Sequence, residues 1–130
     1  MDLTAITPKN FNPAVNNAYS HAIKAGNFLF LSGQVPLDDL GRMVGFRDIR
    51  AQTRQVFENI KVILEEAGTS LDKIVRWNGY IVNMDKNYTG FADVRAQYFP
   101  KDPKPTATLV EALSLAHKDF EIEVEAIAVV

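Results

Sequence analysis

The sequence contains no cysteine among its 130 residues. Without thiols, the chain cannot build a disulfide framework, a zinc ribbon, an iron–sulfur site or a cysteine nucleophile. It also has no apolar run approaching about 18 residues, and no apolar stretch of signal-peptide length follows Met1. We therefore expect no membrane partner, and the absence of cysteine fits a protein of the reducing cytoplasm.

An excess of charge of one sign is missing as well. The chain carries 14 basic and 16 acidic residues, for a formal net charge of −2. Sequence-independent nucleic-acid binding draws its affinity from a basic footprint, so no nucleic-acid partner is expected. Hydrophobic residues make up 47% of the chain and charged residues 23%, which is typical of a soluble globular domain. At this length we expect a single domain over residues 1–130.

Several motifs that carry chemistry are also absent. No Gly-x-Ser-x-Gly elbow is present, which argues against a serine hydrolase. His21 and His117 lie far apart in the sequence, and neither has the spacing of a metal ligand pair. No glycine-rich phosphate loop opens a helix. The sequence therefore predicts neither a metal ion nor a cofactor.

The segments that are present alternate between strand and helix patterns. Residues 1–17, rich in proline and asparagine, predict a loop-like arm. Apolar periodicity then predicts the order strand, strand, helix, strand, helix, strand, strand, which is typical of an α+β fold with both helices on one side of a mixed sheet. We expect strands at 19–24, 28–34, 74–82, 106–113 and 120–130, helices at 49–67 and 88–99, and a polar turn at 83–87.

The first helix has the clearest boundaries. Asp48 is a good N-cap residue, and Gly68 suits the position just after the last turn. Apolar residues recur at spacings of three and four, which predicts a buried stripe. The polar residues between them are assigned to the solvent side: Arg50, Gln52, Arg54, Glu58, Lys61 and Glu65.

The strands at 28–31 and 74–81 are apolar on both faces. Two helices cover one side of the sheet, and no third helix is available for the other. An uncovered apolar face of this size favours association, and a second copy of the chain is the simplest cover. The sequence therefore predicts a closed homo-oligomer with binding sites at the seams between subunits.

Three carboxylates alternate along the last strand, Glu121, Glu123 and Glu125, about 6.5 to 7 Å apart. A solvated strand face is one explanation for them. However, Ile127 and Val129 continue the same face as apolar residues, so part of this face should be covered. A glutamate at the edge of a covered seam would have a raised pKa and could hold or activate a water molecule.

Four blocks of residues together resemble the RidA/YjgF/YER-type reactive intermediate deaminase family, also described as endoribonuclease L-PSP-like. The resemblance runs from about Tyr19 to Val130. The Ser-Gly-Gln-x-Pro block and the Glu-x-Glu-Ala-Ile-Ala ending are specific as a pair. The blocks are Asn17–Ala22, Leu29–Pro36, the helix positions Thr53, Val56, Asn59 and Ile60, and Ile122–Ala128.

The resemblance implies a chorismate-mutase-like α+β protomer of ferredoxin-like topology and a homotrimer with an inner barrel. It also implies small-molecule clefts between subunits and hydrolysis of enamines or imines to 2-keto acids and ammonia. By position, the water-placing glutamate of the family falls on Glu123, and ligand-contacting residues fall on Tyr19 and on Ser32 with Gly33.

The sequence departs from the family at the arginine that clamps the substrate carboxylate. The Pro-Ala-Arg-Ser/Thr pattern aligns with residues 105–108, which places Ala107 at the arginine position and Thr108 beside it. Arg95 and Lys104 are candidates for a replacement cation, although both also fit ordinary surface charges. Enamine or imine hydrolysis and a non-catalytic ligand-binding or protein-interacting trimer therefore both stay open. An endoribonuclease or translation inhibitor is a weaker alternative.

Overall fold

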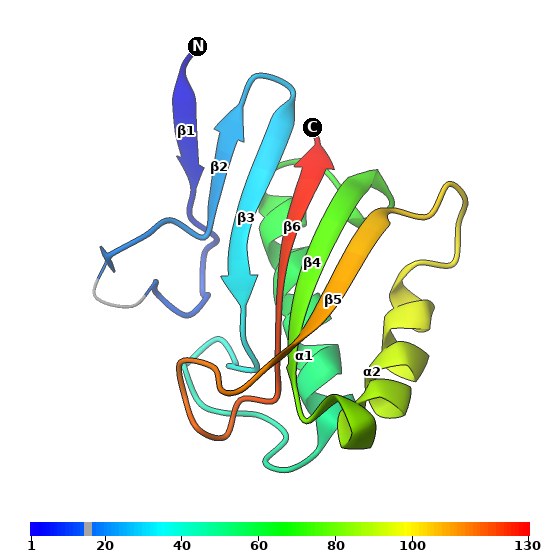
Figure 1. Ribbon diagram of the computed structural model, residues 1–130. Helices are drawn as coiled ribbons and strands as arrows, with labels where there is room; N and C mark the ends of the chain where they lie inside the picture. Colours follow the sequence, from blue (N-terminus) through cyan, green and yellow to red (C-terminus); the bar gives the residue numbers. More distant parts are fainter. Residues whose placement is uncertain (15–16) are drawn as a thin grey trace.

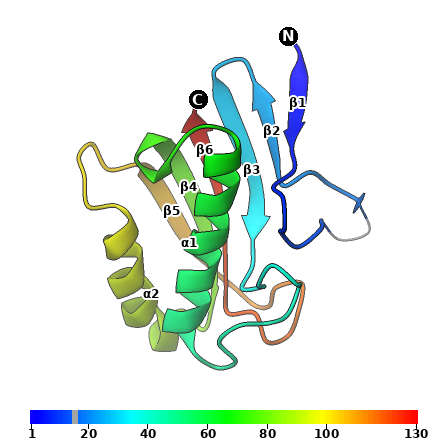
Figure 2. The same ribbon diagram turned by 180° about the vertical axis from the view of Figure 1, so that it is seen from behind.

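Six strands form one sheet, and two helices pack on one of its faces (Figures 1 and 2). The computed structural model describes residues 1–14 and 17–130. Along the sheet the strand order is β1-β2-β3-β6-β4-β5. The elements are β1 (Leu3–Ile6), β2 (Ala22–Ala25), β3 (Phe28–Gln34), α1 (Ile49–Glu66), the 3-10 turn η2 (Leu71–Lys73), β4 (Ile74–Val82), α2 (Met84–Tyr98), β5 (Thr106–Ala112) and β6 (Ile122–Val129).

The sheet is mixed. β4 and β5 run parallel, while the other neighbouring strands are antiparallel. The predicted α+β arrangement with both helices on one face is confirmed. The ferredoxin-like topology is wrong, because that topology follows the order β-α-β-β-α-β. From β3 onward this chain follows β-α-β-α-β-β, since α2 crosses over between two parallel strands, and such a connection usually needs a helix.

The loop-like arm predicted for residues 1–17 is wrong at its start. Leu3–Ile6 forms β1, which pairs antiparallel with β2. The edge of β2 offers free backbone donors and acceptors, and even a segment of four residues can satisfy them. Residues 15 and 16 of the predicted arm lie outside the described residues.

The boundaries of α1 are confirmed, whereas those of α2 are not. The Asp48 side chain accepts a hydrogen bond from the Ala51 amide at 3.1 Å, and Gly68 follows the helix at φ +83°. α2 already begins at Met84, within the predicted polar turn. Asn83 turns the chain at φ 56°, and the Glu111 carboxylate accepts from the Met84 amide at 2.8 Å, so one amide of the first turn finds its acceptor on β5.

The core lies between the helices and one face of the sheet, and the opposite face is left open. Leu29 and Leu31 are buried beneath α1, but Phe28 and Phe30 on the other face of β3 are each 46% exposed. Val110 on β5 is 44% exposed. The apolar run of β3 therefore has one face that the described part of the chain does not cover.

Among the described residues, we find no helix with both the length and the apolar character needed to cross a membrane.

Candidate functional site

A cavity of about 620 Å³ lies where the end of β3 meets the start of β6, and we call it the β3–β6 cavity. It brings together four of the residues singled out in the sequence: Tyr19, Ser32, Gly33 and Glu123. Glu121 precedes β6 and does not line it. The remaining lining residues are Asn12, Pro13, His21, Gln34, Val35, Leu37, Ala116, His117 and Phe120.

The carboxylate of Glu123 lies directly against the backbone of Gly33. A Cβ atom placed on Gly33 would lie 2.9 Å from Glu123 Cδ and closer still to Oε2, which real side chains do not allow. The pairing of β3 with β6 is irregular between Leu31 and Gln34, so Ser32 and Gly33 form a bulge at this point. The bulge and the missing side chain together make room for the carboxylate.

The pKa of the Glu123 carboxyl is raised. Burial is the larger cause, and the negative charge of Glu125 on the same face of β6 adds to it. Tyr80 on the adjacent strand donates to Glu125 Oε1 at 3.0 Å, and this bond holds the second carboxylate in place. A carboxylate with a raised pKa in a partly buried cavity is a stronger base than a solvated one and suits the orientation of a water molecule.

His21 forms the inner wall of the cavity. Its Nε2 atom lies 2.8 Å from the carbonyl oxygen of Asn12, and its Nδ1 atom lies 3.2 Å from the side-chain nitrogen of Gln34. A carbonyl can only accept, so Nε2 carries the proton and Nδ1 accepts from the amide. Both ring nitrogens are engaged, and His21 therefore positions its neighbours while Phe11 and Tyr19 pack edge-on against its ring.

Ser32 and Tyr19 stand at the accessible side of this wall. The Ser32 hydroxyl donates to the carbonyl of Ser20 at 2.6 Å, so its oxygen remains able to accept from a ligand. Tyr19 is 45% exposed, and its ring centroid lies 6.0 Å from that of His21. Both side chains can contact a ligand that enters beside Glu123.

A second cavity, of about 410 Å³, lies beside the start of β5, and we call it the β5-edge cavity. Ala107, Arg95 and Lys104 line it together. Lys104 Nζ is held by the carbonyls of Pro100 and Lys101, each at 3.2 Å. The guanidinium of Arg95 rests over the Phe91 ring at 5.7 Å, and it makes no ion pair with any residue in 1–14 or 17–130. Arg95 is therefore the freer of the two candidate cations.

The two cavities do not meet within one chain. They share no lining residue, and β6 and β4 lie between β3 and β5 in the sheet. Thr108 lines neither cavity; its hydroxyl accepts from the Arg76 guanidinium at 2.9 Å. The predicted site residues thus form two separate groups, with Glu123 in one and Ala107 in the other.

Four polar lining residues were not predicted as site residues from the sequence: Asn12, His21, Gln34 and His117. The available signal was the position of Gln34 at the end of an apolar strand, where a buried polar group must find a partner. Within the described ranges no cluster of three or more His, Asp or Glu side chains is arranged to hold a metal ion.

The sequence and the fold of this chain are similar to those of known proteins. The profile of a family described as endoribonuclease L-PSP matches residues 10–130. A RutC family protein of Pyrococcus horikoshii is 45% identical over 125 residues, covering 96% of this chain and 93% of that protein. The crystal structure of the Rid family protein YyfA from Yersinia pestis is 38% identical, with a TM-score of 0.91 over 99% of this chain and 100% of that one. The structure of TdcF from E. coli, which has serine bound, is 28% identical, with a TM-score of 0.86 over 98% of both chains.

Proposed function

The chain belongs to the endoribonuclease L-PSP family, and from that premise we propose that it binds a small organic ligand between the subunits of a homotrimer. At that site it hydrolyses an enamine or imine. The family includes the Rid and YjgF proteins. The relative TdcF binds serine, a small zwitterion, which is consistent with a ligand of this size.

The separation of the two cavities carries this proposal. Glu123, which is suited to placing water, lies in the β3–β6 cavity with Ser32, which can contact the ligand, while Arg95 lies beside the edge strand β5. A ligand held by both groups needs the β5 edge of a second copy to approach the β3–β6 cavity of the first. The exposed apolar face that includes Phe28, Phe30 and Val110 supports such an association, because water contact with this surface is unfavourable.

The proposed reaction follows from the basicity of Glu123. The carboxylate takes a proton from a water molecule as the water oxygen bonds to the imine carbon. The proton then passes to the imine nitrogen, which gives a carbinolamine. The same carboxylate takes the proton of the new hydroxyl group and passes it to the amine nitrogen as the carbon–nitrogen bond breaks, so that the products are a carbonyl compound and ammonia. Tyr19 and Ser32 would contact the ligand, and Arg95 of a neighbouring subunit would pair with its carboxylate in place of the arginine that Ala107 replaces.

The test is the release of 2-keto acid from 2-iminopropanoate or 2-iminobutanoate generated in situ. We expect the protein to accelerate release above the spontaneous rate, and Arg95→Met to reduce that acceleration by about tenfold or more, as loss of a charge-assisted contact requires. Asp93→Asn, an exposed change on the same helix, serves as the control. A rate equal to the spontaneous one would contradict the enzymatic proposal.

A second candidate, ligand binding without turnover, is favoured by Ala107 itself. An alanine supplies no bidentate clamp, and such a clamp is worth about 1.5 to 3 kcal/mol and also fixes orientation. Ala107→Arg distinguishes the two candidates. If Arg95 already provides the cation, the new guanidinium changes keto-acid release little. If the native site binds without turnover, the substitution creates activity that the native protein lacks.

Endoribonuclease activity, which the family description names, has less support. Both nitrogens of His21 are engaged with Asn12 and Gln34, and Nδ1 of His117 accepts from the Asp119 amide at 3.1 Å. The β3–β6 cavity therefore offers no pair of unengaged histidines for RNA cleavage. The net charge of −2 also provides no general attraction for RNA.

A further inference from the structure

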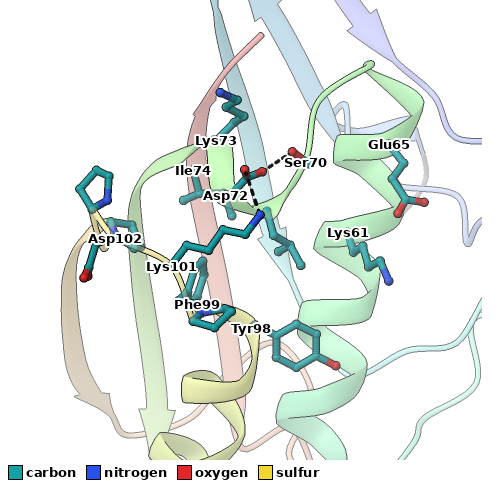
Figure 3. Close-up of a pocket in the computed structure, with 14 residues that line it drawn as sticks. Lys61, Glu65, Ser70, Asp72, Lys73, Ile74, Tyr98, Phe99, Lys101 and Asp102 are labelled. Carbon is teal, nitrogen blue, oxygen red and sulfur yellow. Dashed lines mark hydrogen bonds and ion pairs between the residues drawn. The ribbon is translucent and has the colours of Figure 1, made fainter.

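A third cavity lies on the helix side of the molecule and shares no lining residue with the β3–β6 cavity (Figure 3). It has a volume of about 410 Å³ and is enclosed by three segments: the later turns of α1, the turn η2 with its flanks, and the end of α2 with the loop that follows. We call it the α1–α2 cavity. Its volume lies at the lower end of the range of small-molecule sites, about 300 to 1,000 Å³, and suits a ligand the size of an amino acid.

The floor of the α1–α2 cavity is apolar and well supported. Tyr98 stacks on the buried ring of Phe57 with centroids 5.1 Å apart, and Phe99 meets the same ring edge-on at 5.6 Å. The Tyr98 hydroxyl donates to Glu58 at 2.8 Å, which directs its polar end away from the cavity and onto α1. Leu71, Ile74 and the prolines at 100, 103 and 105 complete the apolar lining.

One loose ion pair spans this floor. Figure 3 shows Lys101 reaching from the loop after α2 to Asp72 on η2, with Lys101 Nζ 3.9 Å from Asp72 Oδ2. The two side chains are 75% and 42% exposed. An exposed pair at this distance contributes about 0 to 1 kcal/mol, so a ligand can separate its partners with little loss.

Asp72 is well suited to remain charged when the ion pair opens. The Ser70 hydroxyl donates to its other carboxylate oxygen, and this bond, with the charge of Lys101, lowers the pKa of Asp72. The rim as a whole, this pair included, is electrically balanced. It carries three cations and three anions: Lys61, Lys73, Lys101, Glu65, Asp72 and Asp102.

We propose that the α1–α2 cavity binds the zwitterion of an apolar α-amino acid. The ammonium group would pair with Asp72, the carboxylate with Lys101, and the side chain would lie on the floor formed by Tyr98 and Phe99. A ligand with one charge satisfies only one partner of the opened pair and faces a like charge at the other. A zwitterion replaces both halves of the pair at once, and its apolar side chain gains burial that the ion pair alone does not provide.

The test is a calorimetric titration with L-phenylalanine, together with 3-phenylpropanoate and 2-phenylethylamine, which keep the ring and one charge each. We expect saturable binding of phenylalanine at least about tenfold tighter than that of either analogue, because each analogue loses one charge-assisted contact. Equal affinity for an analogue, or no binding of phenylalanine, overturns the proposal.

Variants locate the binding and separate it from the site of the proposed function. Asp72→Asn and Lys101→Met each change an exposed side chain and should weaken phenylalanine binding by about tenfold. Lys118→Met, an exposed lysine outside this cavity, is the matched control. Glu123→Gln should leave phenylalanine binding unchanged. If Glu123→Gln abolishes binding while Asp72→Asn and Lys101→Met do not, the amino acid occupies the β3–β6 cavity and the proposal is wrong.

Discussion

At the scale of single residues, the chemistry of the β3–β6 cavity depends on the contact between Glu123 and Gly33. The carboxylate can lie against β3 because residue 33 has no side chain. The same placement removes the carboxylate from water and sets it near Glu125, so the charged form is disfavoured in the folded state. A group arranged in this way supports proton transfer and reduces the stability of the fold at neutral pH.

Replacement of Glu123 by Gln should therefore abolish activity and stabilise the protein. The pKa of this carboxyl is higher in the folded state than in the unfolded chain, so the folded state binds the proton more tightly. The stability that this protonation contributes is complete below the ordinary pKa of a glutamate and is lost as pH rises through the raised pKa. At pH 7 we expect Glu123→Gln to gain at most about 1 kcal/mol in free energy of unfolding, because the native carboxylate is only partly buried.

Urea unfolding at pH 4 and pH 7, at equal protein concentration, measures this difference, which should shrink at the lower pH. Keto-acid release in the same variant should fall by about 100-fold or more, as loss of a general base requires. Glu66→Gln, an exposed change at the end of α1, controls for the chemistry of the substitution. A variant that is less stable than the native chain at pH 7 would show that Glu123 contributes structurally.

At the scale of elements, α1 does more than cover the sheet, because Gln52 connects it to the segment that leads into β6. Its side-chain nitrogen donates to the carbonyls of Gly45 and Asp119, each at 3.0 Å. Its oxygen accepts from the Glu121 amide at 2.8 Å. Glu121 is two residues before Glu123, so this fully buried glutamine helps to set where the carboxylate enters the cavity.

We expect Gln52→Leu to lower the free energy of unfolding by about 2 to 4 kcal/mol. Leucine fits the volume but leaves three partly buried backbone groups without this partner, and such a group costs about 1 to 3 kcal/mol when it cannot relax toward water. The change in urea midpoint measures the loss. Gln97→Leu is the matched control, because Gln97 is exposed on α2 and makes one bond, to Arg54. Equal effects of the two substitutions would contradict the role assigned to Gln52.

At the scale of the whole molecule, the two faces of the sheet differ in how much of their surface is exposed. One face is covered by α1 and α2 (Figures 1 and 2). The other face presents the exposed side chains of Phe28 and Phe30 on β3, the strand that pairs with β6. A surface that combines exposed aromatic side chains with a partly buried glutamate is poorly suited to water. Association of copies through this face would cover the apolar part and leave the carboxylates at the seams.

Phe30→Asp should therefore dissociate the proposed trimer. Burying an unpaired carboxylate at a subunit contact costs several kcal/mol, which corresponds to a loss of about 100-fold or more in association. Sedimentation equilibrium should give three times the chain mass for the native protein and the mass of one 14.5 kDa chain for the variant. Val62→Asp, at a position 39% exposed on α1, is the matched control and should leave the assembly intact. A native protein that sediments as a single chain would contradict the proposal.

The sequence by itself determined the features that depend on local periodicity and composition. The caps of α1 at Asp48 and Gly68, the alternation along β6 and the α+β class all follow from which side chains recur at which spacing. Its blocks also indicated the family correctly. The sequence could not predict that Gln52 is buried. Burial of a polar helix residue depends on backbone groups elsewhere in the chain that form hydrogen bonds with it.

Only the tertiary structure decided which residues meet. Strand pairing depends on contacts far apart in the chain, so the strand β1 and the parallel pair β4–β5 left no clear local signal. Packing brought Glu123 against Gly33 and placed Arg95 beside Ala107, yet kept the two groups apart within one chain. Burial of a carboxylate and distance between cavities are properties of a folded surface, and no stretch of sequence contains them.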